Sequence, residues 1–157
     1  MKIFLILVLI VVIMIIAKSV SDQIKDRYDF YYNLKQFLNN FKINLAFKQT
    51  KILDYLNQTN GKKEFKVFIN SYKNFLRTSE VCLDDLKILD ESEKKELADI
   101  INNTGKFDAK NEAFQIDSFL QTVQGKLNRA EQDKVKLCPM IIKLSFLFAI
   151  AVSVLLI

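Results

Sequence analysis

The sequence predicts an all-α protein, a membrane-anchored antiparallel bundle of about five to six helices with a transmembrane helix at each end. Ile3 to Ala17 and Leu144 to Ile157 contain no charged residue, and such segments are stabilised in lipid hydrocarbon. The intervening residues offer almost no turn chemistry for strands and hairpins, because the whole chain has only three glycines and one proline.

The two apolar runs divide the chain into three parts. Both are shorter than the roughly 20 residues that cross a bilayer core, but lysines at their flanks can reach the interface with long side chains. We therefore expect an N-terminal transmembrane helix over residues 1–18, a helical-bundle domain over 19–136 and a C-terminal transmembrane helix over 137–157.

A cleaved signal peptide is the alternative interpretation of the first run, with Ser19 to Ser21 as the cleavage site. Two observations favour a retained anchor. No glycine or proline breaks the apolar run before that site, and basic residues follow at once, namely Lys18, Lys25 and Arg27.

Basic residues cluster beside both predicted spans. The positive-inside rule then places the central domain in the cytoplasm. Asn-x-Thr sequons at Asn57 and Asn102 would suit a secreted domain, but we interpret them as chance in an Asn-rich chain. Because the net charge of +5 gathers at the membrane edges, the expected partner is a bilayer with anionic headgroups and not nucleic acid.

The first span is predicted to continue into a long helix, since apolar residues recur at spacings of three and four from Ile24 to Leu45. The aromatic residues from Tyr28 to Tyr32 fall on this helix, so we interpret them as core and membrane-interface residues and not as a base-stacking surface. A bend near Lys48 to Thr50 precedes a short helix around Ile52 to Leu56, which a turn at Asn60-Gly61 closes.

A core helix is predicted over about residues 62–77, followed by a small amphipathic piece and two more helices. Asp90-x-x-Glu93 reads as a capping box, Gly105 as a helix C-terminal residue and Asp108 as the cap of the last helix. That helix should continue into the second span, with a possible kink at Pro139. The core helix places Phe65, Phe68, Tyr72, Phe75 and Leu76 on one side; the small piece carries Leu83, Leu86 and Leu89; the last helix has a seam of Ala113, Ile116, Leu120, Val123, Leu127 and Ala130.

The residue types needed for common catalytic sites are missing. The chain has no histidine and no Gly-rich phosphate loop, and the acid pairs Asp84-Asp85 and Asp90-Glu91 lie in a charged, capping context typical of a solvated surface. Cys82 and Cys138 are expected to be thiols packed as small apolar groups. We therefore expect no enzyme activity, no metal site and no cofactor.

The order of these elements resembles the stage III sporulation protein AB family. Its first helix usually reads Leu-x-x-Leu-x-x-Glu-Ile-x-Tyr, followed after three residues by Pro-Leu. A Gly-x-x-x-Gly-x-x-Asp run precedes its last helix. In this chain the first pattern falls on Leu38, Phe41, Asn44, Leu45, Phe47, Lys51 and Ile52, and the second on Ile101, Gly105 and Asp108, with Gln115 and Ile116 downstream. Three positions depart from the family: Asn44 replaces the glutamate, Lys51 the proline and Ile101 the first glycine.

The resemblance implies a scaffold in the assembly between mother cell and forespore, in the mother-cell membrane around the forespore. It would position a cytoplasmic secretion-type ATPase and contact other membrane proteins of the same complex. The soluble part of the family is similar to the cytoplasmic module of the type II secretion F component. A platform component of a secretion or pilus apparatus and a membrane-surface binding protein unrelated to sporulation are the alternatives. Candidate partner-binding residues are Asn44, Phe47, Lys48, Lys51, Gly105 and Asp108.

Overall fold

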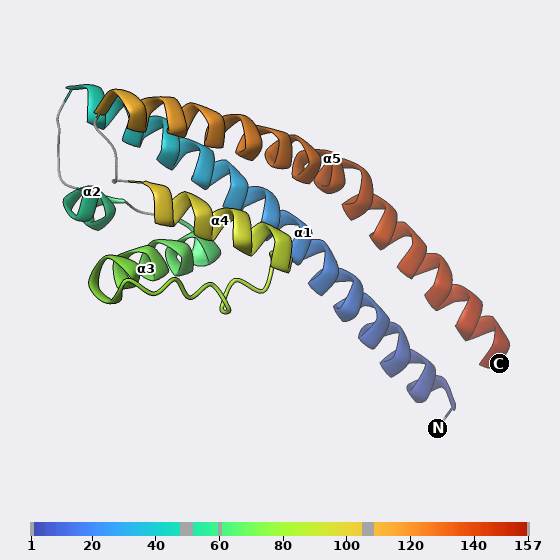
Figure 1. The fold of residues 1–157 in the computed structure, drawn as a ribbon. Coiled ribbons are helices and arrows are strands. Elements are labelled where there is room, and N and C mark those ends of the chain that lie inside the picture. Colours follow the sequence, from blue (N-terminus) through green and yellow to red (C-terminus); the bar gives the residue numbers. More distant parts are fainter. Residues whose placement is uncertain (1, 48–51, 60, 105–108, 157) are drawn as a thin grey trace. The chain divides into compact units, whose positions relative to one another are not determined.

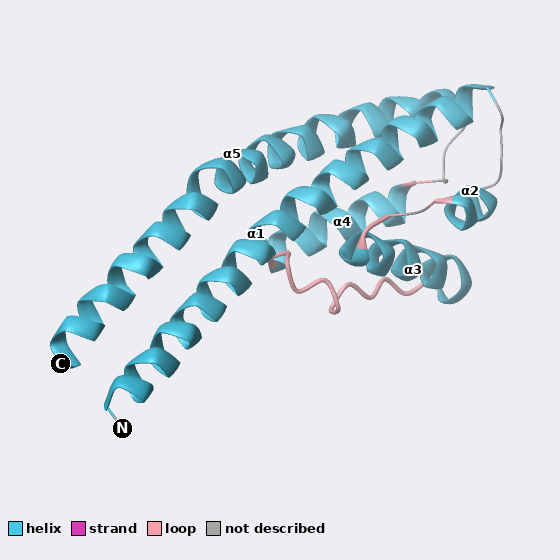
Figure 2. Cartoon of the chain, turned by 180° about the vertical axis from the view of Figure 1, so that it is seen from behind, coloured by secondary structure: helices cyan, strands magenta, loops and turns pink. Residues whose placement is uncertain are grey.

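A computed structural model of the chain describes residues 2–47, 52–59, 61–104 and 109–156. This part of the chain forms helices and no strand, as Figures 1 and 2 show. The prediction of an all-α fold with a long apolar helix at each end is confirmed. The helices are α1 (Lys2–Phe47), α2 (Ile52–Gln58), α3 (Lys63–Thr78), α4 (Glu91–Asn103) and α5 (Ala109–Leu156).

The chain divides into two compact units. The terminal unit comprises Met1–Tyr28 and Asn128–Ile157, and the central unit comprises Asp29–Leu127. Helices α1 and α5 each run without a break from one unit into the other, as predicted for spans that merge into bundle helices. The predicted limits of the spans at residues 18 and 137 are limits of lipid burial, which helix contacts do not define, and they stay predictions.

The core of the central unit is rich in aromatic rings. The ring centroids of Phe30 and Phe37 on α1 lie 6.1–6.4 Å from those of Phe65 and Phe68 on α3, with the rings edge to face. Such pairs stabilise a core beyond the area that they bury. Because α1 supplies these rings at helical spacing, the face of α1 that carries Phe30 and Phe37 forms one wall of the central unit.

The core side of α3 is shorter than predicted. Phe65, Phe68, Ile69 and Tyr72 are buried, but Leu76 in the last turn is 38% exposed, so its assignment to the core was wrong. The helix ends two residues later, and the chain leaves it through Ser79 with a left-handed φ of 61°. At the other end, a Cβ on Gly61 would overlap the ring of the buried Phe65, which explains a glycine there.

The segment between α3 and α4, predicted as a small amphipathic piece, buries its three leucines in successive turns. The backbone N–H of Leu86 donates to the Leu83 carbonyl, and that of Leu89 donates to the Leu86 carbonyl. Cys82 next to them is exposed, so its predicted burial was wrong. The leucines are buried, whereas Cys82 is exposed and its thiol lies 3.7 Å from Asp84 Oδ2.

Helix α4 begins with the predicted capping box. The Glu93 N–H donates to Asp90 Oδ1 at 2.8 Å, and the Asp90 N–H donates to Glu93 Oε2 at 3.1 Å. Gly105 and Asp108, the predicted cap residues farther on, lie outside the described residues.

On α5, the central part of the predicted seam is confirmed at Ile116, Val123 and Leu127, which are buried. Leu120 is only half-buried, because it faces a polar groove shared with α1. The helix continues through Pro139.

Small side chains form the helix contact within the terminal unit. Ala17 and Ser21 on α1 are buried, as are Cys138 and Ala149 on α5. The Cys138 thiol donates to the Ser21 carbonyl at 3.6 Å, so the predicted burial of this thiol is confirmed. Large apolar side chains point outward instead, and both helices are long and apolar enough to cross a membrane.

Candidate functional site

The structure describes one of the six predicted partner-binding residues fully. Asn44 is half-buried near the end of α1. Phe47 is the last residue of α1, and its side chain is not described. The remaining four residues lie outside the described part of the chain, so a shared surface of all six stays a prediction; these are Lys48, Lys51, Gly105 and Asp108.

The helical surface that leads to these residues is held by an ion pair. Lys42 Nζ lies 2.6 and 2.7 Å from the two carboxylate oxygens of Asp117. This contact joins the last turns of α1 to the first turns of α5. Because both side chains are partly exposed, the pair contributes at most about 1 kcal/mol to stability.

Two large apolar side chains are exposed on the same helical segments. Ile43 is 56% exposed on α1, and Phe114 is 77% exposed on α5. We call Lys42, Ile43, Phe114 and Asp117 the distal surface. Exposed aromatic and aliphatic side chains beside partly exposed charges are the usual composition of a protein contact surface.

Sequence reasoning missed Ile43 and Phe114, although a signal was present. Ile43 falls outside the stripe that contains Leu38, Phe41 and Leu45, and Phe114 falls outside the seam of α5. An apolar residue off the core stripe of an amphipathic helix has no core to fill. That mismatch makes both positions candidates for exposure, and the packing of α1 and α5 then exposes them.

A polar groove lies next to the distal surface along α1 and α5. It encloses about 500 Å³, and Lys35 and Asn39 form its α1 side. Asp117, Leu120, Gln121 and Gln124 form its α5 side. Three amide side chains can each donate and accept, so the groove can hydrogen-bond another polar chain, but it contains no nucleophile and base in contact.

The interior of the central unit contains a polar cluster that joins three elements. Tyr72 on α3, Thr104 at the end of α4 and Glu112 on α5 are all buried. Burial raises the pKa of the Tyr72 hydroxyl above its usual value of 10.0, and the negative charge of the Glu112 carboxylate raises it further. The hydroxyl of Thr104 donates to the Ile100 carbonyl at 2.6 Å. The cluster is an internal connection, since it opens to none of the grooves described above.

The predicted acid pairs are surface residues, as expected. Asp84, Asp85, Asp90 and Glu91 are exposed. Within residues 2–47, 52–59, 61–104 and 109–156, no three His, Cys, Asp or Glu side chains gather closely enough to hold a metal ion.

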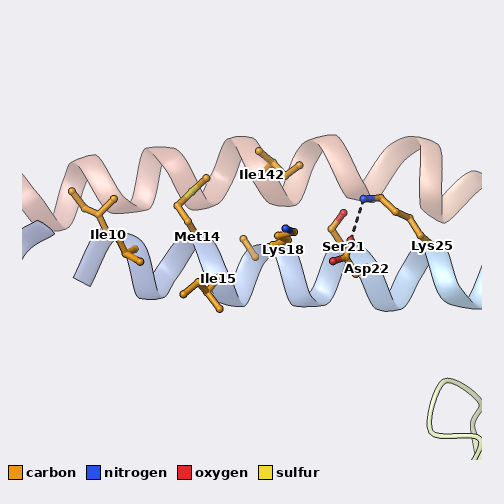
Figure 3. Close-up of a pocket in the computed structure, with 10 residues that line it drawn as sticks. Ile10, Met14, Ile15, Lys18, Ser21, Asp22, Lys25 and Ile142 are labelled. Atoms are coloured by element: carbon orange, nitrogen blue, oxygen red, sulfur yellow. Dashed lines mark hydrogen bonds and ion pairs between the residues drawn. The ribbon is translucent and has the colours of Figure 1, made fainter. Parts of the chain in front are cut away.

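A groove of about 530 Å³ lies within the terminal unit (Figure 3). One end is apolar and is formed by Ile10, Met14 and Ile15 on α1, and Ile142 on α5 lies opposite Lys18, where the groove becomes polar. The other end is polar. Lys18, Ser21, Asp22 and Lys25 line it, and Lys25 Nζ lies 3.3 Å from Asp22 Oδ1.

Comparison with known proteins gives one family for this chain. The family model described as stage III sporulation protein AB matches residues 2–157. Neither a curated protein nor a solved structure gives a significant match. The family match covers both units and the five helices of the described residues.

Proposed function

The chain belongs to the stage III sporulation protein AB family, and from this premise we propose that it is a non-catalytic membrane scaffold that positions a cytoplasmic ATPase. Family membership gives the chain a role in sporulation. The proposed place is the mother-cell membrane around the forespore, with the central unit in the mother-cell cytoplasm and other membrane proteins of the complex as neighbours. Sporulation is favoured over a general secretion or pilus platform because the family model spans the whole helical architecture.

The continuity of two helices is the observation that supports the scaffold most strongly. Helices α1 and α5 both contain a stretch apolar enough for a membrane and a stretch with buried core residues of the central unit, aromatic and leucine on α1 and aliphatic on α5. A force on the central unit is therefore transmitted to two anchors through continuous helices, of which α5 lacks one backbone hydrogen bond at Pro139. A single flexible linker would not serve this purpose.

The distal surface is the proposed docking face for the ATPase. It combines two exposed apolar side chains, Ile43 and Phe114, with the Lys42–Asp117 ion pair. Lys48 and Lys51 follow α1 directly in the sequence and would extend the face with positive charge. Apolar anchors with a charged rim are typical of protein interfaces, where aromatic side chains contribute most of the binding energy.

The test is capture of the purified ATPase of the complex by the full chain in detergent micelles. We expect Phe114→Asp to weaken capture at least about tenfold, as loss of an aromatic anchor costs ~2 kcal/mol. Lys48→Glu with Lys51→Glu should weaken capture in a salt-dependent manner, because rim charges act through long-range attraction.

Leu76→Asp is the matched control, since Leu76 is an exposed apolar residue on α3, outside the distal surface. It should leave capture unchanged. Equal capture by all variants, with melting curves like that of the unmodified protein, would contradict docking on this face. No capture by the unmodified protein would contradict the ATPase as its partner.

A further inference from the structure

We propose that the terminal unit binds one anionic phospholipid in the groove of Figure 3, with an acyl chain along its apolar end and the phosphate at Lys18 and Lys25. The inference rests on the proposed insertion of α1 and α5 into a membrane and not on the docking of an ATPase. It identifies a bound lipid at a defined site, as distinct from the general attraction of a basic protein to an anionic membrane.

The order of side chains along the groove matches the order of groups in a lipid. Ile10, Met14 and Ile15 line the apolar part, and Lys18 is the first charged residue after them. At 1.5 Å per residue, Ile10 and Lys18 are about 12 Å apart along the helix, close to the roughly 15 Å of one hydrocarbon leaflet. A chain lying against Ile10 therefore has its headgroup at the level of Lys18.

The charges at the polar end favour an anionic lipid over a zwitterionic one. Two lysines and one aspartate line this end and leave one positive charge. Lys25 is already paired with Asp22. A phosphodiester carries one negative charge, so a lipid with an uncharged alcohol on its phosphate neutralises the site, whereas a choline or ethanolamine headgroup leaves the surplus in place.

A buried hydroxyl supplies a second, independent indication of a ligand. Ser21 lines the polar end of the groove and is 1% exposed, and its Oγ has no hydrogen-bond partner in the described part of the chain. Buried hydroxyls are normally satisfied, and an unsatisfied one calls for an explanation. A phosphate or ester oxygen at the headgroup level would accept the proton of this hydroxyl.

The chain offers a matched pair of positions for a test. It has no tryptophan, so one introduced indole is the only one present. Val11 and Val12 are both 48% exposed, and Val11 lines the groove while Val12 does not. The full chain with Val11→Trp or Val12→Trp is reconstituted in phosphatidylcholine vesicles that contain a small fraction of brominated phosphatidylglycerol or, separately, brominated phosphatidylcholine.

Bromine quenches indole fluorescence at contact. The quenching by brominated phosphatidylglycerol divided by the quenching by brominated phosphatidylcholine therefore measures local enrichment of the anionic lipid. We expect enrichment at Val11→Trp to exceed that at Val12→Trp by about fivefold, since one lysine near an anionic headgroup contributes ~1 kcal/mol. Adding Lys18→Gln should abolish the excess. Adding Lys143→Gln should preserve it, because Lys143 is an exposed membrane-edge lysine that does not line the groove.

Two results would overturn the proposal. Equal enrichment at both positions means an ordinary annular lipid only, with membrane insertion intact. Absence of quenching by brominated phosphatidylcholine at both positions means that α1 does not insert, which overturns the anchored scaffold as well.

Native mass spectrometry of the unsubstituted chain checks the site without an indole in the groove. Retention of one phosphatidylglycerol, lost in Lys18→Gln and kept in Lys143→Gln, supports the site. Equal retention of phosphatidylglycerol and phosphatidylcholine contradicts it.

Discussion

The two units are built from the same two long helices, yet they bury different kinds of side chain. In the central unit, the buried residues of α1 and α3 are mainly phenylalanine, tyrosine and leucine. In the terminal unit, the buried residues are Ala17, Ser21, Ala130, Cys138 and Ala149, whereas Phe4, Phe146 and Phe148 are exposed.

The surrounding solvent explains the difference. In water, burial of large apolar side chains is the main favourable term, so the central unit collects its aromatic residues inside. In lipid, large side chains lose nothing by facing the acyl chains, and helices associate through small residues that allow close approach. Each long helix therefore has two kinds of buried surface, large side chains in the central unit and small ones in the terminal unit, and the change occurs near the boundary between the units.

The largest expected effect is the loss of the central unit when a charge enters its core. Val123→Asp should unfold this unit, with a cost of more than about 4 kcal/mol, because Val123 is buried on α5. Leu120→Asp should cost only about 1 kcal/mol, since Leu120 is half-buried at a polar groove. Thermal melting followed by circular dichroism measures both. Similar melting of the two variants would show that the seam of α5 is assigned incorrectly.

A pair of phenylalanines tests the aromatic core next. Phe68→Ala should destabilise the protein by about 3–5 kcal/mol, because its ring is fully buried against Phe30 and Phe37. Phe114→Ala should change stability by less than about 0.5 kcal/mol, because that ring is 77% exposed. Denaturant unfolding in mild detergent gives both values, and a large loss for Phe114→Ala would place that ring in a core.

Alkaline pH should weaken the central unit through Tyr55. Burial raises the pKa of its hydroxyl from 10.0 to about 12 in the folded state. The fold therefore favours the neutral hydroxyl, whose contribution is complete below pH 10 and is lost as the pH rises through 12. Tyr55→Phe should be less stable by about 1 kcal/mol at pH 7, because the bond to the Phe37 carbonyl is lost.

Between pH 10 and 12, the stability of Tyr55→Phe should fall less steeply than that of the unmodified protein. The pKa of Tyr72 is also raised, so Tyr72 lowers the stability of both proteins at high pH. Its effect cancels when Tyr55→Phe is compared with the unmodified protein. Parallel stability curves over this range would show that the Tyr55 hydroxyl is not shielded from water.

The smallest expected effect on stability concerns the terminal unit. In a Cys82→Ser background, Ser21→Cys should form a disulfide with Cys138 under mild oxidation, since the Cys138 Sγ lies 3.6 Å from the Ser21 carbonyl oxygen. Melting of the central unit should not change. Val20→Cys is the control, because Val20 is exposed, and it should not form the bond. Faster migration on a non-reducing gel detects the disulfide, and equal yields for the two variants would contradict the contact.

Much of the fold could be predicted from the sequence because local signals agreed with the final structure. The capping box at Asp90 and Glu93 and the spacing of apolar residues on α1 and α3 are short-range patterns, and each one specified its helix. Where the predictions were wrong, the cause was tertiary. The exposure of Leu76 and Cys82 depends on which other elements of the fold cover them. The spacing of apolar residues along one helix does not contain that information.

The functional surfaces were harder to predict than the fold. Ile43 and Phe114 are visible in the sequence as apolar residues off their stripes, but their exposure needs the packing of α1 and α5. The lipid groove depends on Ile142, far from Ile10 in the chain, so only a structure brings its two sides together. The Ala17-x-x-x-Ser21 spacing is the local signal that a close helix contact lies there.

The orientation of the central unit is the central claim, and a pair of reporter fusions tests it most directly. A reporter active only outside the cytoplasm is fused after Gly61, in the central unit, or after Ile157. An anchored scaffold with a cytoplasmic central unit predicts a silent fusion after Gly61 and an active fusion after Ile157. The reverse pattern would contradict both the orientation and the docking of a cytoplasmic ATPase.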